Sequence, residues 1–200
     1  MSDVLIVPTG TANLASVKAA FQRLGADVAM AGQAEEIEAA MRVVMPGVGA
    51  FASSIGHLRR RGFADALCAR IAAGRPTFAV CVGLQLLFEG SEESPDTRGL
   101  GAISGRITRL PDSVRVPQLG WNRVEAGAGC SLIEPGHAYF ANSYRATPPL
   151  PDGWATATAD HGGPFIAAFE RGPVLACQFH PELSGPWGQA LIERWLEKAA

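Results

Sequence analysis

The sequence predicts an α/β fold: a mostly parallel central sheet with helices on both faces and antiparallel additions. Three observations carry this prediction. Short apolar runs alternate with helical patterns through the first 90 residues, and glycines stand where helices should end. After residue 121, strand-like pieces follow one another between Gly, Pro and Asp turns, which is typical of antiparallel strands.

The first half reads as strands and helices in alternation. The expected strands are residues 4–7, 28–30, 43–45 and 77–80, and the expected helices are residues 14–24, 35–41, 63–73 and 84–88. Gly25 and Gly74 follow two of these helices, where a glycine favours termination. Short apolar strands separated by helices indicate a parallel sheet that is covered on both sides.

The second half predicts antiparallel strands and a closing helix. The expected strands are residues 138–144, 154–159, 165–169 and 174–179. Residues 188–198 form an amphipathic pattern with Leu191, Ile192, Trp195 and Leu196 on one face. Residues 89–101 are rich in Ser, Glu, Asp and Gly and are interpreted as a mobile loop, a candidate lid or substrate contact.

Composition limits the class of protein. The chain has 200 residues, a formal charge of −2 and 48% hydrophobic residues, which predicts a single soluble domain over residues 1–200. Near-neutral charge disfavours nucleic-acid binding, and the basic run at residues 59–61 is interpreted as a solvated helix face or helix end. Without a secretion signal or a bilayer-spanning run of about 20 apolar residues, a cytoplasmic protein with no membrane partner is expected.

The four cysteines are scattered along the chain. They are Cys68, Cys81, Cys130 and Cys177. None has CxxC or Cys/His ligand spacing, so the pattern indicates neither a zinc site nor a disulfide framework. We expect reduced thiols, no metal and no cofactor, which leaves a reactive thiol open.

Cys81 has the sequence setting of a nucleophile elbow. It lies between an apolar strand and a helix start, in Ala79-Val80-Cys81-Val82-Gly83. A sharp turn there would expose the sulfur, and the backbone N–H of Val82 would face a developing oxyanion. Elbows often place glycine at position 79, and Ala79 is still small. The competing interpretation is a buried cysteine that serves as a small hydrophobe.

His180 and Glu182 follow an apolar strand in the segment Gln-Phe-His-Pro-Glu. A cysteine nucleophile needs an imidazole as proton acceptor and a carboxylate that orients it. The alternative is a structural turn in which Glu182 pairs locally. The other histidines, His57, His137 and His161, fall in a helical region and in two turns and are interpreted as surface or loop residues.

Together, Cys81, His180 and Glu182 resemble the catalytic triad of the class I glutamine amidotransferases, which have a flavodoxin-like α/β fold. The resemblance covers almost the whole chain and is strongest with the glutaminase subunits of imidazole glycerol phosphate synthase. The matching segments are Pro-Gly-Val-Gly-Ala-Phe at 46–51, residues 85–89, residues 116–122 with Leu-Gly-Trp-Asn, residues 139–144 and residues 178–182. The first and third are the most specific.

The resemblance implies a role for each site residue. Cys81 would attack the side-chain amide of L-glutamine, His180 would move the proton, and Glu182 would orient the imidazole. The oxyanion donors would be the N–H of Val82 and an N–H from Gly47-Val48-Gly49, with Val48 as the gate. The substrate pocket would be formed by Gly47, Gln85, Glu93, Asn142, Ser143 and Tyr144. Glu89 and Glu92 compete with Glu93 for the substrate's ammonium group.

The resemblance also implies a partner. The family passes its ammonia to a (β/α)8-barrel cyclase subunit, which makes imidazole glycerol phosphate in histidine biosynthesis. The Leu-Gly-Trp-Asn segment at residues 119–122 is the expected partner contact, against the alternative that Trp121 is ordinary core.

The sequence departs from the family at several positions. The usual Asp-Tyr-Gly-x-Gly-Asn-Leu reads Pro8-Thr9-Gly10-Thr11-Ala12-Asn13-Leu14 here, which makes coupling to the cyclase less certain than the glutaminase chemistry. Ala79, Val82 and Asn142 replace the common glycine, leucine and histidine. Two alternatives stay open: a glutaminase of another synthase, such as the pyridoxal phosphate synthase type, and a non-catalytic regulatory protein on the same fold. Leu-Gly-Trp-Asn argues against the first.

Overall fold

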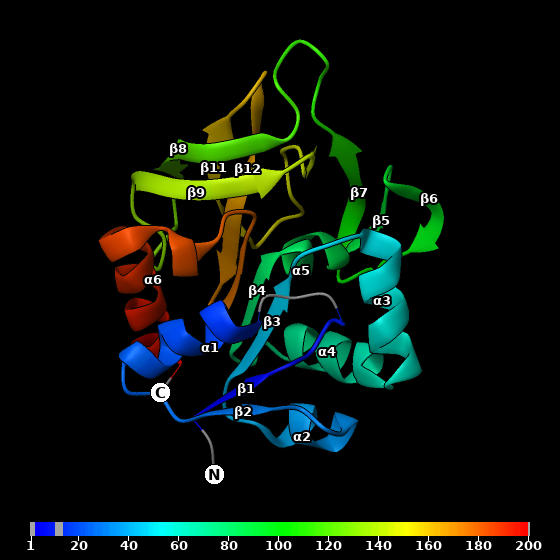
Figure 1. The fold of residues 1–200 in the computed structure, drawn as a ribbon, viewed down its shortest axis with the longest axis vertical. Helices are drawn as coiled ribbons and strands as arrows, with labels where there is room; N and C mark the ends of the chain where they lie inside the picture. The colour runs from blue at the N-terminus through cyan, green and yellow to red at the C-terminus, as the bar shows by residue number, and fades with distance from the viewer. Residues whose placement is uncertain (1–2, 11–13, 200) are drawn as a thin grey trace.

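The computed structural model describes residues 3–10 and 14–199, and its largest sheet is shown in Figure 1. In the described residues this sheet has nine strands, in the order β2-β1-β3-β4-β13-β12-β11-β8-β9. The parallel strands are β2 (Val28–Met30), β1 (Val4–Ile6), β3 (Val43–Gly47), β4 (Thr77–Cys81) and β13 (Val174–Cys177). The antiparallel strands are β12 (Pro164–Arg171), β11 (Ala155–Asp160), β8 (Gln118–Ala126) and β9 (Gly136–Asn142).

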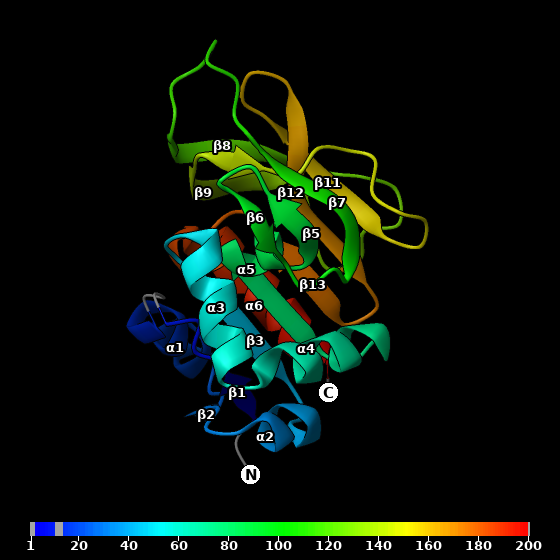
Figure 2. The same ribbon diagram turned by 90° about the vertical axis from the view of Figure 1, so that its right-hand side faces the viewer.

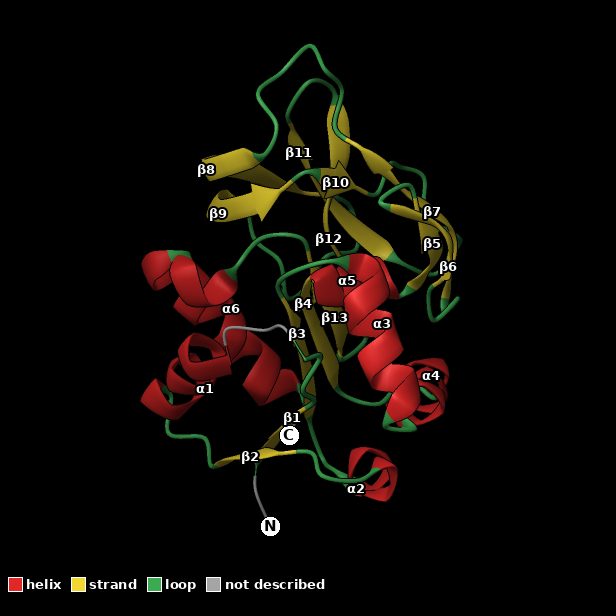
Figure 3. Cartoon of the chain, turned by 45° about the vertical axis from the view of Figure 1, so that its right-hand side comes forward, coloured by secondary structure: helices red, strands yellow, loops and turns green. Residues whose placement is uncertain are grey.

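Helices cover both faces of the parallel part, as Figure 3 shows. One face carries α1 (Leu14–Arg23) and α6 (Gly185–Lys198). The other carries α3 (Phe51–Arg60), α4 (Phe63–Ala72) and the short α5 (Val82–Leu86), and α2 (Ala34–Ala39) packs against α4. All residues of β3, β4 and β13 are buried, as expected for strands between two helical layers. The predicted α/β fold class is confirmed.

The closing helix α6 packs through the predicted face. Leu191, Ile192 and Trp195 are buried, and the Trp195 ring contacts the rings of Phe21 on α1 and Phe78 on β4. Aromatic side chains bury large apolar areas, so this contact holds α1 and α6 on the same face of the sheet. No described helix is long and apolar enough to cross a bilayer.

Some elements lie outside the strands and helices expected from the sequence. They include α3, β8 and β7 (Ile103–Arg109). Helix α3 ends at Arg60, so the interpretation of the basic run at residues 59–61 as a helix end is confirmed. The helix expected at residues 84–88 begins earlier, at Val82, and ends at Leu86.

The prediction of a mobile loop at residues 89–101 is wrong. The segment forms a hairpin of β5 (Phe88–Ser91) and β6 (Ser94–Arg98), and β5 also pairs with β7. With β10 (Tyr144–Arg145) these strands make a second sheet in the order β10-β7-β5-β6, which Figure 2 shows beside α5. Asp96 and Arg98 on β6 are exposed, while the backbone groups of the segment are satisfied by strand pairing. The hairpin therefore places its turn, which contains Glu93, next to the elbow.

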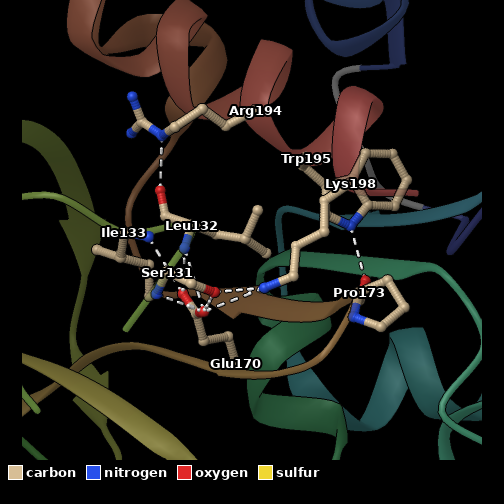
Figure 4. Close-up of polar contacts among 8 residues, drawn as sticks. All are labelled: Ser131, Leu132, Ile133, Glu170, Pro173, Arg194, Trp195 and Lys198. Atoms are coloured by element: carbon tan, nitrogen blue, oxygen red, sulfur yellow. Dashed lines mark hydrogen bonds and ion pairs between the residues drawn. The ribbon is translucent and has the colours of Figure 1, made fainter. Parts of the chain in front are cut away.

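A buried carboxylate joins the antiparallel strands to the closing helix (Figure 4). Glu170 on β12 is 3% exposed, and it accepts hydrogen bonds from the backbone N–H groups of Ser131, Leu132 and Ile133 at 2.8 to 3.1 Å. The Ser131 hydroxyl donates to it as well, at 2.6 Å. Arg194 Nε on α6 donates to the Leu132 carbonyl at 2.8 Å. These contacts fix the turn between β8 and β9 against both β12 and α6.

A second buried charge, Arg70 on α4, ties α2 to the sheet. Its guanidinium donates to the backbone carbonyls of Ile37, Ala40 and Pro76 at 2.7 to 2.8 Å. Burial, followed by the nearby positive charge of Arg75, lowers the pKa of Arg70 to about 10. Carbonyls at the end of a helix attract a cation, so Arg70 closes the carboxyl end of the short helix α2.

Candidate active site

The junction of β4 and α5 is a sharp turn at Cys81. Its backbone has φ 55° and ψ −112°, and among the described residues it is the only one other than glycine with positive φ. Holding a side chain in such a conformation costs on the order of 1–3 kcal/mol, so the surrounding structure must enforce it. The side chain is 4% exposed and its sulfur lines a cavity. The predicted elbow is present.

Two glycines allow the elbow to lie close to β3. A Cβ on Gly83 would lie 2.2 Å from the Met45 carbonyl oxygen, and a Cβ on Gly47 would lie 2.8 Å from Cβ of Val82. Neither approach leaves room for a side chain. The Ala79 methyl, by contrast, would lie 3.7 Å from a Cβ at position 83, an ordinary contact. Alanine is therefore accommodated at position 79, and the need for glycine at position 83 comes from the Met45 carbonyl.

Parallel pairing of β13 with β4 brings the second half of the triad to the elbow. Cys177 pairs with Val80, so the residues that follow each strand emerge at the same edge of the sheet. His180 directly precedes the 3-10 helix η1 (Pro181–Leu183), and its Nδ1 lies 2.9 Å from Oε1 of Glu182. Both side chains are 6% exposed. The backbone at His180 is extended, and the turn of η1 that follows brings Glu182 back to the imidazole.

The environment of His180 favours its protonated form. Burial lowers the pKa of the imidazole, but hydrogen bonds to the Cys81 and Glu182 side chains and the charges of both groups outweigh it and raise the pKa to about 10. A ring with this pKa holds a proton at neutral pH beside the sulfur. Folding thus brings Cys81 and His180 to the lining of one cavity, with Glu182 hydrogen-bonded to the imidazole.

A cavity of about 300 Å³ opens above the sulfur. It is lined by Val48, Gly49, Cys81, Val82, Gln85, Glu93, Ala141, Asn142, Ser143, Tyr144 and His180. All but two of the site residues expected from the sequence are in this lining. The two others, Gly47 and Glu182, lie behind it around a void of about 10 Å³ that His180 and Val48 also line. The cavity has the size of a small-molecule site.

The turn of the β5-β6 hairpin places one glutamate side chain in the lining of this cavity. Glu93 lines it and accepts a hydrogen bond from the backbone N–H of Phe51, the first residue of α3, at 2.9 Å. Glu89 instead accepts from the Gly105 N–H at 2.9 Å, and Glu92 accepts from the Arg109 N–H at 2.7 Å. Of the three competing acids, the geometry therefore brings Glu93 to the site.

The floor of the cavity carries oriented amides. Gln85 Nε2 donates to the Tyr144 carbonyl at 3.3 Å, and Asn142 Nδ2 donates to the same oxygen at 3.1 Å. The side-chain oxygen of Asn142 is buried and has no hydrogen-bond partner among the described residues. Since a buried acceptor without a donor is costly, this oxygen is suited to a donor on a ligand.

Sequence reasoning missed Gln178. It is fully buried, and its Nε2 lies 3.7 Å from the sulfur of Cys81. The signal was present: in an extended segment, residues two apart point to the same side, and Gln178 stands two positions before His180. Polar residues at such a spacing next to a candidate catalytic histidine are candidates for the same site.

The altered amino-terminal segment reaches the same region. Thr9 is buried and its hydroxyl donates to the Pro46 carbonyl at 3.0 Å, just before the Gly47-Val48-Gly49 loop. Pro8 is partly buried beside it. Thr11, Ala12 and Asn13 lie outside the described residues, so the consequences of Ala12 for coupling stay a prediction.

The remaining histidines and cysteines lie elsewhere. His57 is on α3, His161 Nε2 donates to the Arg115 carbonyl at 2.8 Å, and His137 is exposed. The turn expected for His137 is wrong because it lies in β9, paired with Arg123. The four cysteines are free, and no group of three His, Cys, Asp or Glu residues in residues 3–10 and 14–199 is arranged to hold a metal.

Several known proteins are similar to this chain over most of its length. The family Glutamine amidotransferase class-I matches residues 5–199. The chain is 39% identical to the imidazole glycerol phosphate synthase subunit HisH of Mycolicibacterium paratuberculosis, covering 98% of both chains. It is 40% identical to the HisH subunit of Rhodopirellula baltica, covering 96% of both.

A plant relative is longer. The chain is 39% identical to the chloroplastic imidazole glycerol phosphate synthase hisHF of Arabidopsis thaliana, over 98% of this chain but 34% of that one. It therefore spans about a third of the plant protein. Among solved structures, a glutamine amidotransferase superposes with a TM-score of 0.77 at 23% identity, over 98% of both chains. PurLQS of Thermotoga maritima gives a TM-score of 0.76 at 15% identity, over 98% and 99%.

The solved structures establish the shared fold, whereas the HisH relatives match the chain from end to end at a level that establishes descent. This chain belongs to the class-I glutamine amidotransferase family, within its branch of HisH subunits of imidazole glycerol phosphate synthase.

Proposed function

We propose that Cys81, His180 and Glu182 hydrolyse glutamine to glutamate and ammonia in this cavity. The Cys81 thiolate attacks the side-chain amide carbon of glutamine and forms a tetrahedral intermediate. His180, protonated beside the sulfur, gives its proton to the departing ammonia and leaves a thioester. A water that has lost a proton to His180 then attacks the thioester and releases glutamate. The observation that carries the proposal is the strained Cys81 in the same cavity lining as His180, whose imidazole Glu182 orients.

Two backbone N–H groups are proposed to stabilise the oxyanion. The N–H of Val82 follows the nucleophile at the start of α5. The second donor comes from the loop Gly47-Val48-Gly49, where Val48 and Gly49 line the cavity and Gly49 has φ 105°. Glycine tolerates this conformation, so the loop can reorient at small steric cost, and Val48 is the proposed gate.

The polar lining suits glutamine. We assign the substrate's α-ammonium to Glu93, because its carboxylate is the acid that lines the cavity. Gln85, Asn142, Ser143 and Tyr144 surround the rest of the molecule, and the unpaired Asn142 oxygen offers an acceptor to one of its N–H groups. Gly47 contributes by letting the oxyanion loop lie against the elbow.

The proposed partner is a (β/α)8-barrel cyclase subunit that receives the ammonia and makes imidazole glycerol phosphate in the cytoplasm. An exposed apolar surface supports this: Leu119 is 65% exposed, Trp121 58% and Leu183 46%. The interpretation of Trp121 as core is therefore wrong. The Trp121 ring packs edge-on against Tyr139, whose carbonyl accepts the backbone N–H of His180 at 2.9 Å. A partner that binds this surface would contact Trp121, which packs against the residue that is hydrogen-bonded to His180.

Glutaminase activity measured with and without the cyclase and its nucleotide ligand tests chemistry and partner together. We expect ammonia release that rises when both are added. A glutamine-like covalent inactivator should label Cys81 in the complex, and Cys81→Ala should abolish both labelling and hydrolysis. Cys68→Ala is the matched control and should leave both intact, because Cys68 lies on α4 and lines a different cavity.

Two other results would redirect the assignment. Stimulation by a synthase of the pyridoxal phosphate type, with none by the cyclase, would favour the first alternative. An unlabelled Cys81 in the assembled complex would favour a non-catalytic regulatory protein.

The apolar surface can be tested separately. Trp121→Ala should weaken binding of the cyclase by about 10- to 100-fold, because exposed tryptophans at interfaces carry much of the binding free energy. Met41→Ala removes another exposed apolar side chain, 54% exposed, just before β3 at the opposite end of that strand from the active site, and should leave affinity unchanged. Equal affinity of both variants, measured by calorimetry, would place the partner elsewhere.

A further inference from the structure

A relay of side-chain amides runs beneath the nucleophile, and the proposed mechanism leaves one member of it without a role. Gln178 is fully buried between Gln85 and Cys81. Gln85 Nε2 donates to Oε1 of Gln178 at 2.9 Å and to the Tyr144 carbonyl at 3.3 Å. Gln178 Nε2 in turn donates to the sulfur of Cys81 at 3.7 Å.

The direction of this relay is fixed at its far end. The Tyr144 carbonyl can only accept a hydrogen bond, so the atom of Gln85 that faces it must be nitrogen. The same nitrogen has a second N–H, which faces Gln178, so the atom of Gln178 on that side must be oxygen. The nitrogen of Gln178 is then left facing the sulfur. Turning either amide over would set donor against donor or acceptor against acceptor inside the core.

The sulfur therefore meets a donor that cannot rotate away. We infer that Gln178 is a positioning residue, which holds the sulfur of Cys81 through an N–H···S hydrogen bond and favours its ionised, nucleophilic form. The inference rests on the proposed function of Cys81. Hydrogen bonding to the charged form of a group stabilises that form, and an ionised sulfur accepts more strongly than a thiol. Because Gln85 lines the cavity, the relay also joins the substrate pocket to the nucleophile.

Other titratable groups face the sulfur and must be held constant in any test. His180 contacts it, with Glu182 behind. Cys177 on β13 interacts with it electrostatically, and Glu93 and Tyr144 line the same cavity. The Gln178 side chain is uncharged. Replacing it with methionine therefore removes a hydrogen bond to the sulfur without removing a charge.

The test is the pH dependence of Cys81 alkylation by iodoacetamide in the full chain, followed by mass spectrometry of the Cys81 peptide. Gln178→Met keeps the length of the side chain and removes the donor. We expect the midpoint of the pH–rate profile to rise by about one pH unit, so that alkylation slows about tenfold at pH values below the wild-type midpoint and keeps the same rate at high pH. A purely structural role for Gln178 would change the high-pH rate or the melting temperature and leave the midpoint in place.

Gln118→Met is the matched control. Gln118 is another buried amide, on β8, and no described hydrogen bond joins it to the sulfur. In this variant, the midpoint of the pH–rate profile of Cys81 alkylation should equal that of the wild type. Gln178→Glu keeps the shape of the side chain and serves if the methionine variant does not fold. Its midpoint should rise further because a carboxylate would face the sulfur.

Glutaminase kinetics provide a second test of the role of Gln178. We expect Gln178→Met to lower kcat about tenfold and to change KM for glutamine less than twofold, since Gln178 is not in the cavity lining. A wild-type midpoint in Gln178→Met overturns the inference. Failure of the proposed function looks different: in that case Cys81 of the wild type would react at pH 7 no faster than Cys68.

Discussion

Two buried carboxylates of this chain are held in opposite ways. Glu170 accepts from three backbone N–H groups and a hydroxyl, so both of its oxygens are satisfied (Figure 4). Glu182 accepts from His180 through one oxygen, and its other oxygen, Oε2, is buried without a hydrogen-bond partner among the described residues. The two side chains are almost equally buried, with 3% exposure for the residue Glu170 and 6% for the Glu182 side chain.

The difference shows what each site is built for. Backbone donors at fixed positions make Glu170 a structural anchor, because any movement of the turn at residues 131–133 would break several hydrogen bonds at once. Glu182 faces a single partner whose protonation changes during the proposed reaction. An incompletely satisfied buried charge costs free energy, and such a cost is typical of functional sites.

The largest effect should come from breaking the catalytic member of the pair. Glu182→Gln keeps the shape of the side chain but removes the charge that orients and stabilises protonated His180. We expect kcat for glutamine hydrolysis to fall about 10³- to 10⁴-fold, while the melting temperature changes by only a few degrees. The measurement is ammonia release by the complex with the cyclase. A variant with near-normal kcat would mean that Glu182 is a structural residue like Glu170.

The structural member should behave in the reverse way. Glu170→Gln places an amide N–H₂ against backbone donors and leaves buried groups unpaired, so unfolding should become easier by about 3 kcal/mol. Alkylation of Cys81 per folded molecule should stay at the wild-type rate. Chemical denaturation and iodoacetamide labelling check the two parts. A loss of Cys81 reactivity without a loss of stability would contradict the comparison.

The contrast also explains how far the sequence could lead. The elbow at Cys81 and the pair of His180 and Glu182 were predictable because each depends on local order: an apolar strand, then a reactive residue at its carboxyl end. Parallel pairing of two such strands brings the residues together without further information. The α/β class followed from the same alternation.

What the sequence did not predict depends on distant partners. The residues of strand β6, Ser-Pro-Asp-Thr-Arg, have the composition of a loop. They form a strand because β6 pairs with β5, which in turn pairs with β7. Gln178 gains its orientation from Gln85 and from the Tyr144 carbonyl, which belong to other elements. Glu170 reads as a lone acid in an apolar strand, and its donors lie in a turn between two other strands. Each outcome rests on tertiary contacts that override local preference.

The catalytic side of the comparison also predicts a dependence of stability on pH. The pKa of His180 is about 10 in the folded protein against an ordinary 6.5, so between these values the folded state holds a proton that the unfolded state has released. The stabilisation is therefore complete below pH 6.5 and is lost as pH rises toward 10. We expect the unfolding free energy of the wild type, minus that of His180→Gln, to decline across this window. A difference that stays flat or grows would refute the sign.

The smallest effect should come from the cation beside the structural carboxylate. Lys198 Nζ lies 3.9 Å from Glu170 Oε1, and the lysine side chain is 35% exposed. Solvent screens such a pair, and Glu170 is already satisfied by backbone donors, so Lys198→Met should change the unfolding free energy by less than about 1 kcal/mol. The double variant with Glu170→Gln should cost no more than the sum of the two single changes. If Lys198→Met instead destabilised the fold as much as Glu170→Gln, the anchor would be an ion pair rather than a carboxylate held by backbone N–H groups, and the contrast with Glu182 would need a different cause.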